Sequence, residues 1–276
     1  MSFITVRGKK LYFQDRGEGF PLLFGHSYLW SSKMWQLQLD FLSKHFRCIA
    51  TDLWDHGISD HLGEEFSLES CAEEHWQLMQ HLEVDEFAMI GLSVGGMWGT
   101  HLALQHPEAV KALVLMDTFV GSEPSVSQKR YFNLLDKLES DGRFTPEFFD
   151  LIAPMFFSPH TFQNQKELVD NFRKELLAVE SERIPGIVEI GRKIFSRADL
   201  LPKLSTIEQP SLVIVGRDDL PRPPKESELM AESLPHATLQ IVENAGHISN
   251  LEQIEEVNSL LFNFIQTVSQ KMEVNQ

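Results

Sequence analysis

The chain has 276 residues, of which 42% are hydrophobic, and this is enough to bury the core of a globular protein. Its formal net charge is −16, so electrostatic attraction to nucleic acid or to an anionic membrane is not expected. No apolar stretch approaches the length of a membrane span, and residues 1–10 lack the apolar segment of a secretion signal. The two cysteines, Cys48 and Cys71, lie in unrelated contexts and are expected to be reduced, so we predict a cytoplasmic protein.

The first part of the chain alternates short apolar runs with helical patterns. Residues 3–6 and 11–14 alternate apolar and polar side chains around a turn, which predicts an antiparallel hairpin. Buried strands are predicted at 21–24, 46–51, 87–90 and 111–116. Helices are predicted at 34–42, 67–81 and 94–106. Strands that alternate with helices in this way predict parallel pairing, with helices covering both faces of the sheet.

The pattern changes after residue 118. Only helical patterns follow, at 128–140, 146–157, 165–182 and 184–196, before strands return at 210–216 and 238–242. Further helices are predicted at 224–234 and 251–268. We therefore predict a core domain formed by residues 1–118 and 205–276, with a helical cap inserted at 119–204.

The run Gly91-Leu92-Ser93-Val94-Gly95 lies between a buried strand and a helix. A strand that turns at once into a helix must bend sharply, and a Cβ two residues before or after the apex would clash. Glycines at these two positions therefore indicate that Ser93 is a nucleophile held at the apex. A chance match is the alternative, and the flanking strand and helix make it less favoured.

A serine hydroxyl needs a base, and a histidine base needs a carboxylate that orients it. His247 follows a buried strand, where loops of an open α/β sheet form a ligand crevice, so it is the candidate base. Asp218 and Asp219 follow the preceding strand, and Asp117 is the rival acid. His101 is assigned to the core or to a helix face. Seven other histidines are expected at the solvated surface: His45, His61, His75, His81, His106, His160 and His236.

These motifs resemble the α/β-hydrolase fold, and in particular its Ser-His-Asp esterases with a helical cap. The resemblance covers nearly the whole chain through the serine motif, the segment Gly216-Arg-Asp-Asp219 and the segment Asn244-Ala-Gly-His247. It implies a mostly parallel eight-stranded sheet flanked by helices, and it favours Asp219 over Asp218 as the acid. The segment 52–59 resembles a loop that orders the rim of the site in this family.

The resemblance also implies an oxyanion hole made by two backbone N–H groups. One is that of Val94, directly after the nucleophile, and the second maps onto Tyr28. The family has a His-Gly pair before this second donor, whereas this chain has His26-Ser27. His26 is interpreted as an anchor of the loop rather than as a base.

The substrate pocket is predicted to be apolar and to form at strand ends and on the inner face of the cap. Its candidate residues are His26, Ser27, Leu29, Trp30, Trp54, Phe119, Phe156 and Phe157. Arg222 follows the acid loop and is the one cation expected near the site. A carboxylate-binding role is the alternative to that of an exposed loop arginine, and the exposed arginine is favoured. Metal-binding, phosphate-binding and dinucleotide-binding spacings are missing from the sequence, so no metal or cofactor is expected.

The sequence therefore predicts a serine hydrolase that cleaves small to medium carboxylic esters through an acyl-enzyme. Lactonase, carbon–carbon bond hydrolase and cofactor-free perhydrolase activities use the same three residues and stay open as alternatives. A ligand receptor that keeps the hydrolase pocket without catalysis is the alternative from another class. The expected partner is a small ester, not nucleic acid or a membrane, and a homodimer is left open.

Overall fold

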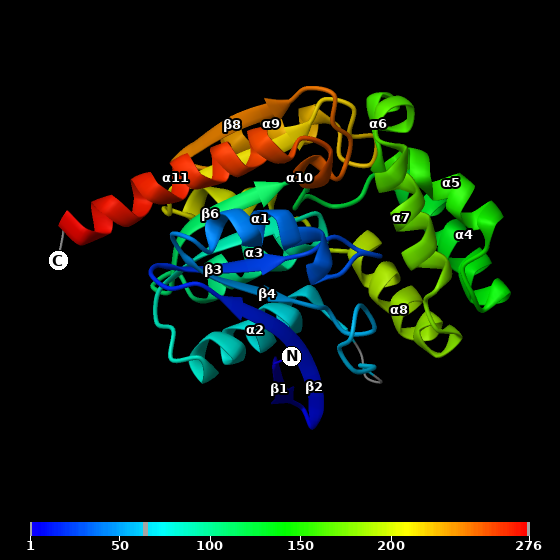
Figure 1. Cartoon of the computed structure of the whole chain (residues 1–276), viewed down its shortest axis with the longest axis horizontal. Coiled ribbons are helices and arrows are strands. Elements are labelled where there is room, and N and C mark those ends of the chain that lie inside the picture. The colour runs from blue at the N-terminus through cyan, green and yellow to red at the C-terminus, as the bar shows by residue number, and fades with distance from the viewer. Residues whose placement is uncertain (1, 63–65, 275–276) are drawn as a thin grey trace.

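The computed structural model describes residues 2–62 and 66–274 and contains one eight-stranded sheet (Figure 1). Its strands are β1 (Ser2–Val6), β2 (Lys9–Arg16), β3 (Pro21–Gly25), β4 (Arg47–Thr51), β5 (Phe87–Leu92), β6 (Val110–Met116), β7 (Ser211–Gly216) and β8 (Ala237–Val242). β1 and β2 form the predicted hairpin, β2 pairs antiparallel with β4, and the other neighbours are parallel. The prediction of a mostly parallel sheet is confirmed.

The strand order β1-β2-β4-β3-β5-β6-β7-β8 determines where a ligand crevice forms. From β3 the chain moves to β4 on one side, and it later returns to β5 on the other side of β3. Loops that leave the carboxyl ends of β3 and β5 therefore diverge and leave a crevice between them. β5, β6 and β7 are buried along almost their whole length, which explains their continuous apolar sequences.

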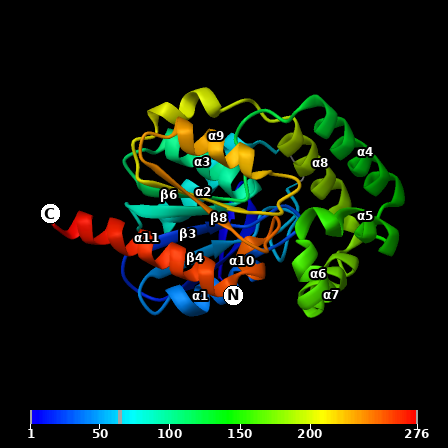
Figure 2. The ribbon, with the colours of Figure 1, turned by 90° about the horizontal axis from the view of Figure 1, so that it is seen from above.

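Helices cover both faces of the sheet, as Figure 2 shows from above. One face carries α1 (Gln36–Leu42) and α11 (Ile254–Val274), which contact each other. The other face carries α2 (Leu68–His81), α3 (Val94–Gln105) and α9 (Pro224–Ser233). The single C-terminal helix predicted at 251–268 is instead two helices, α10 (Ser249–Glu252) and the longer α11. No helix within the described ranges combines the length and the apolar character needed to cross a membrane.

Between β6 and β7 the chain forms a group of helices that lies at one end of the sheet (Figure 1). We call it the α4–α8 insertion, and it consists of α4 (Ser125–Asp141), α5 (Pro146–Phe156), α6 (Pro159–Asn164), α7 (Lys166–Leu177) and α8 (Ile184–Phe195). α6 was not predicted, and it begins because Ser158 caps it and Pro159 occupies its first turn. α7 ends at Leu177, five residues before the predicted end at Glu182.

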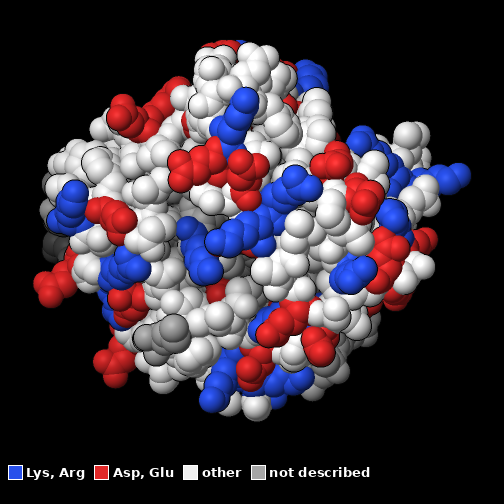
Figure 3. All heavy atoms as spheres, turned by 45° about the vertical axis from the view of Figure 1, so that its right-hand side comes forward, with Lys and Arg blue, Asp and Glu red and all other residues white. Residues whose placement is uncertain are grey.

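Charges of both signs are mixed on the face that carries the insertion, where Figure 3 shows a hollow near the centre of the view. A groove of about 370 Å³ lies between the insertion and the core. It is lined by Leu29, Trp30, Ser31, Lys33, Asp55, His56, Gly57, Ile58, Phe144, Glu175, Leu176, Ala178, Val179, Glu180, Arg183 and Ile187. The surface here is therefore not uniformly acidic, although the chain carries a net charge of −16.

Candidate active site

Ser93 occupies the apex of the turn between β5 and α3. Its φ of 58° and ψ of −119° are strained for a residue with a side chain. A Cβ on Gly91 would overlap the backbone of Gly95, and one on Gly95 would overlap the carbonyl oxygen of Gly25. Thr118 Oγ1 donates to the Ser93 carbonyl oxygen at 2.6 Å and helps to hold the turn. The two glycines are thus required by the close approach of backbone to backbone.

Replacing Gly95 by alanine is expected to destabilise the protein by about 1–3 kcal/mol or more, because the neighbouring backbone of β3 cannot yield easily. For a chain of this size, each kcal/mol corresponds to a fall in Tm of roughly 2–4 °C. Gly8→Ala is the matched control, since Gly8 has a φ of 76° but no atom near its Cβ position. Thermal melts of both variants would contradict this account if Gly95→Ala were the milder change.

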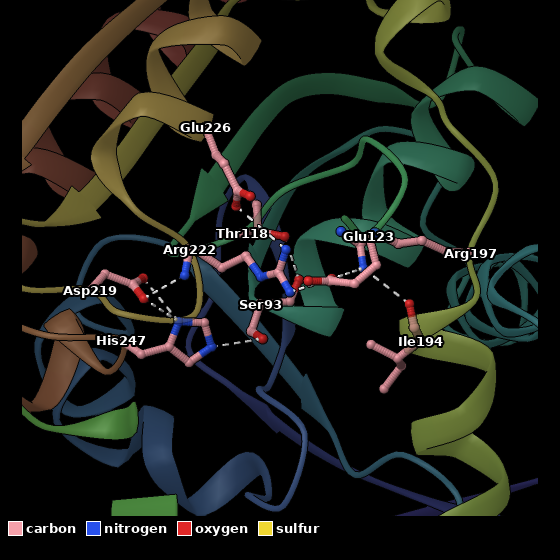
Figure 4. Close-up of polar contacts among 9 residues, drawn as sticks. All are labelled: Ser93, Thr118, Glu123, Ile194, Arg197, Asp219, Arg222, Glu226 and His247. Atoms are coloured by element: carbon pink, nitrogen blue, oxygen red, sulfur yellow. Dashed lines mark hydrogen bonds and ion pairs between the residues drawn. The ribbon is translucent and has the colours of Figure 1, made fainter. Parts of the chain in front are cut away.

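The structure brings Ser93, His247 and Asp219 into one chain of hydrogen bonds (Figure 4). His247 Nε2 lies 2.9 Å from Ser93 Oγ, and His247 Nδ1 lies 2.9 Å from Asp219 Oδ2. The three residues follow the carboxyl ends of β5, β8 and β7, respectively, and all are buried. The backbone N–H of His247 donates to the carbonyl oxygen of Phe156, so the α4–α8 insertion helps to position the histidine.

The other two candidate acids are placed differently. Asp218 is only partly buried, and the carboxylate that contacts His247 is that of Asp219. Asp117 accepts hydrogen bonds from the N–H of Gly216 and from the hydroxyl of Ser249. Burial raises the pKa of Asp117 well above its usual value, with repulsion from Asp219 as the second cause. Asp117 therefore joins the end of β7 to the start of α10 and makes no hydrogen bond with His247.

The two backbone N–H groups predicted for the oxyanion hole make no hydrogen bond to any of the described residues. Within 2–62 and 66–274, no acceptor takes the N–H of Val94 or that of Tyr28. The Tyr28 hydroxyl donates to the Ile187 carbonyl oxygen of α8 at 2.6 Å, which fixes this loop against the insertion.

The His26 side chain makes two hydrogen bonds in the same region. Its Nε2 accepts the N–H of Leu53 at 2.8 Å, so its Nδ1 carries the proton and donates to the Ser27 carbonyl oxygen. Burial lowers the pKa of His26 to about 4 and keeps the ring neutral. The side chain thus joins residue Ser27 to the segment that follows β4.

A cavity of about 50 Å³ adjoins Ser93 and His247. It is lined by Ser27, Tyr28, Ser93, Met97, Tyr131, Met155, Phe156, Ile194, Phe195, Pro221, Arg222 and His247. Of the predicted pocket residues, Ser27 and Phe156 line this cavity, whereas Leu29 and Trp30 line the larger groove. Four others line neither space: His26, Trp54, Phe119 and Phe157.

The sequence did not identify Tyr131, Ile194 and Phe195 as cavity residues. They lie on α4 and α8, and an amphipathic pattern shows only that one face of a helix is buried. Whether that face meets another helix or a cavity depends on the packing of α4 against α8.

Two expectations about individual side chains were wrong. Arg222 was expected to be exposed, but it is 2% exposed and forms ion pairs with Glu123 and Glu226. His75 was expected at the solvated surface, but it is buried and stacks on Trp98, with ring centroids 4.1 Å apart. His75 lies on the same face of α2 as other buried residues, so its helical spacing carried a signal of burial.

Comparison with known proteins finds one matching family model and several similar sequences. A family model described as alpha/beta hydrolase fold matches residues 20–253. The chain is 25% identical to 3-oxoadipate enol-lactonase 2 of Acinetobacter baylyi over 86% of this chain and 85% of that protein. It is 28% identical to the putative carbamate hydrolase RutD of Serratia proteamaculans, over 92% and 96% of the two chains.

Solved structures are similar along nearly the whole chain. A thermophilic esterase from Thermogutta terrifontis, solved with malate bound, has a TM-score of 0.89 at 26% identity. The match covers 97% of this chain and 98% of the esterase chain. The enol-lactonase from Burkholderia xenovorans LB400 has a TM-score of 0.86 at 25% identity, covering 96% and 100%. With the family model matched from residue 20 to residue 253, this chain belongs to the alpha/beta hydrolase family.

Proposed function

We propose that this hydrolase cleaves small to medium carboxylic esters through an acyl-enzyme on Ser93. The observation that carries the proposal is the continuous chain of hydrogen bonds from Ser93 Oγ through His247 to Asp219. This arrangement supplies a nucleophile, a base and an orienting carboxylate, which are the groups that acyl transfer requires. The similarity to an esterase over 97% of the chain supports the same reaction class.

In the proposed reaction, His247 Nε2 takes the proton of Ser93 Oγ as that oxygen attacks the ester carbonyl. The backbone N–H groups of Val94 and Tyr28 stabilise the negative charge that develops on the carbonyl oxygen. The tetrahedral intermediate then collapses, and His247 gives its proton to the leaving alcohol. Water, activated by the same nitrogen, attacks the acyl-enzyme and releases the acid. Throughout, Asp219 stabilises the imidazolium form of His247.

The α4–α8 insertion acts in this proposal as a cap over the reaction site. Tyr131, Met155, Phe156, Ile194 and Phe195 come from the insertion and form one side of the cavity. A wall of this kind excludes bulk water and strengthens the electrostatic interactions inside. The cap role also agrees with the hydrogen bond that joins the insertion to the histidine loop.

A lactonase is the second candidate, because two of the similar proteins are named enol-lactonases. A lactone is a cyclic ester, and the same nucleophile, base and oxyanion donors would open its ring. The difference from an acyclic ester is that the leaving alcohol stays attached to the acyl group. The carbamate hydrolase name of another relative points to a carbonyl substrate with a nitrogen substituent, attacked in the same way.

The size of the cavity predicts a preference for short acyl chains. A space of about 50 Å³ holds few atoms beyond the reacting carbonyl. We expect kcat/KM for p-nitrophenyl acetate or butyrate to exceed that for the decanoate by about ten-fold or more, since added methylenes must displace packed side chains. A series of p-nitrophenyl esters from acetyl to decanoyl measures this. A flat profile, or one that rises with length, would show that the acyl group lies in the larger groove instead.

A further inference from the structure

A buried guanidinium group lines the cavity beside the candidate nucleophile. The Arg222 side chain extends from the acid loop past His247 and Ser93 towards Glu123 (Figure 4). The surrounding cavity residues are mostly apolar: Met97, Met155, Phe156, Ile194 and Phe195. A charged group in such surroundings is costly unless it is paired or serves a ligand.

The partners of Arg222 leave part of its hydrogen-bonding capacity unused. Its Nη2 donates to Glu123 Oε2, and the same oxygen accepts Nη1 of Arg197 at 2.9 Å. Its Nη1 lies 3.4 Å from Glu226 Oε2, a long contact. Among the described residues, no acceptor takes the Nε–H of Arg222.

Arg197 increases the excess of donors over acceptors. This side chain is buried, and its Nε and Nη2 have no hydrogen-bond partner among the described residues. Burial lowers the pKa of Arg197 to about 10, with repulsion from Arg222 as the second cause and attraction to Glu123 opposing both. Two guanidinium groups thus share one oxygen of one buried carboxylate, and Glu226 is the second carboxylate of the cluster through its long contact with Arg222. The N–H donors of the two arginines therefore outnumber the carboxylate oxygens that accept them.

We propose that this end of the cavity binds a free carboxylate of the substrate, and that Arg222 is the residue that contacts it. The proposal rests on the proposed function, and it narrows the substrate class to short esters or lactones that carry a second, ionised carboxyl group. A carboxylate is planar, carries a single charge and fits the fork of a guanidinium group. Tyr131 lines the same cavity, and its hydroxyl, which has no hydrogen-bond partner among the described residues, adds a second donor.

The test compares two esters with the same four-carbon acyl chain, monoethyl succinate and ethyl butyrate, in a pH-stat assay. The wild-type protein is expected to show a kcat/KM about ten-fold or more higher for monoethyl succinate, mainly through a lower KM, as a charge-assisted hydrogen bond provides. Arg222→Gln is expected to remove this preference. The backbone N–H of Arg222, which donates to Asp219 at 2.9 Å, remains in that variant.

Two further variants separate a binding role from a structural one. Arg217→Gln is the matched control, because Arg217 lies in the same loop but is exposed and pairs with Glu243. This variant should prefer monoethyl succinate over ethyl butyrate to the same extent as the wild type. Glu123→Gln removes the carboxylate of the protein that competes with the substrate carboxylate for Arg222, so the preference for monoethyl succinate should rise. If the cluster only held the fold together, Glu123→Gln would instead lower the rates on both esters alike and leave their ratio unchanged.

Binding measurements distinguish failure of this inference from failure of the proposed function. Hydrolysis of ethyl butyrate in preference to monoethyl succinate, or a preference that survives Arg222→Gln, would overturn the carboxylate site alone. If neither ester is hydrolysed, calorimetric titration of the Ser93→Ala protein still decides: tighter binding of monoethyl succinate supports the site, and equal or weaker binding refutes it.

Discussion

Replacing Ser93 by alanine is expected to lower kcat for p-nitrophenyl butyrate by about 10,000-fold or more. The change removes the only oxygen that lies within hydrogen-bond distance of His247 Nε2 among the described residues. Without it, no acyl-enzyme can form, and only the oxyanion donors and substrate binding remain to assist attack by water. The assay is steady-state turnover, with intact-protein mass spectrometry to follow the acyl adduct at early times.

The fold of the Ser93→Ala protein should be unchanged, because alanine meets the same strained φ of 58° and the side chain lies at a cavity rather than in the packed core. Its Tm is therefore expected within a few degrees of that of the wild type. Equal turnover by the two proteins would remove Ser93 from the mechanism. An absence of turnover in both, together with ligand binding in the cavity, would favour the receptor function instead.

The parts of this molecule that were predictable from sequence are those where local geometry restricts the choice of residue. The turn at Ser93 tolerates only glycine at two positions, and the buried parallel strands need apolar side chains on both faces. Each of the residues Ser93, Asp219 and His247 follows a strand of this kind, and parallel strands place their carboxyl ends at one edge of the sheet. Short-range patterns and this one rule were therefore sufficient to bring three distant residues together.

The lining of the cavity was less predictable, because it depends on packing between segments far apart in the chain. Tyr131 and Phe195 stack with ring centroids 4.1 Å apart, although they lie on opposite ends of the α4–α8 insertion. Arg222 is buried because Glu123, 99 residues earlier, is placed beside it. Neither contact has a periodic signature in the sequence, since a charged residue in a loop rich in proline resembles an exposed one.

Replacing Asp219 by asparagine is expected to lower kcat by about 10,000-fold, because an amide cannot stabilise the imidazolium form of His247 and favours the wrong tautomer. The geometry of the loop should persist, since an amide oxygen can still accept the backbone N–H of Arg222. Asp218→Asn is the matched control, one residue away and without contact to His247; we expect it to change kcat by less than about ten-fold.

Asp117→Asn completes this comparison, because Asp117 is the other buried carboxyl group at the strand ends. Burial raises the pKa of Asp117, which lessens the effect of losing its charge, and an amide oxygen can still accept the hydrogen bond from Gly216. Its kcat is therefore expected to stay far closer to that of Asp218→Asn than to that of Asp219→Asn. Measuring kcat for all three variants on p-nitrophenyl butyrate decides between the acids. A collapse of activity in Asp218→Asn or Asp117→Asn, with Asp219→Asn still active, would assign the orienting carboxylate to that other residue. It would also require the His247 ring to turn away from Asp219.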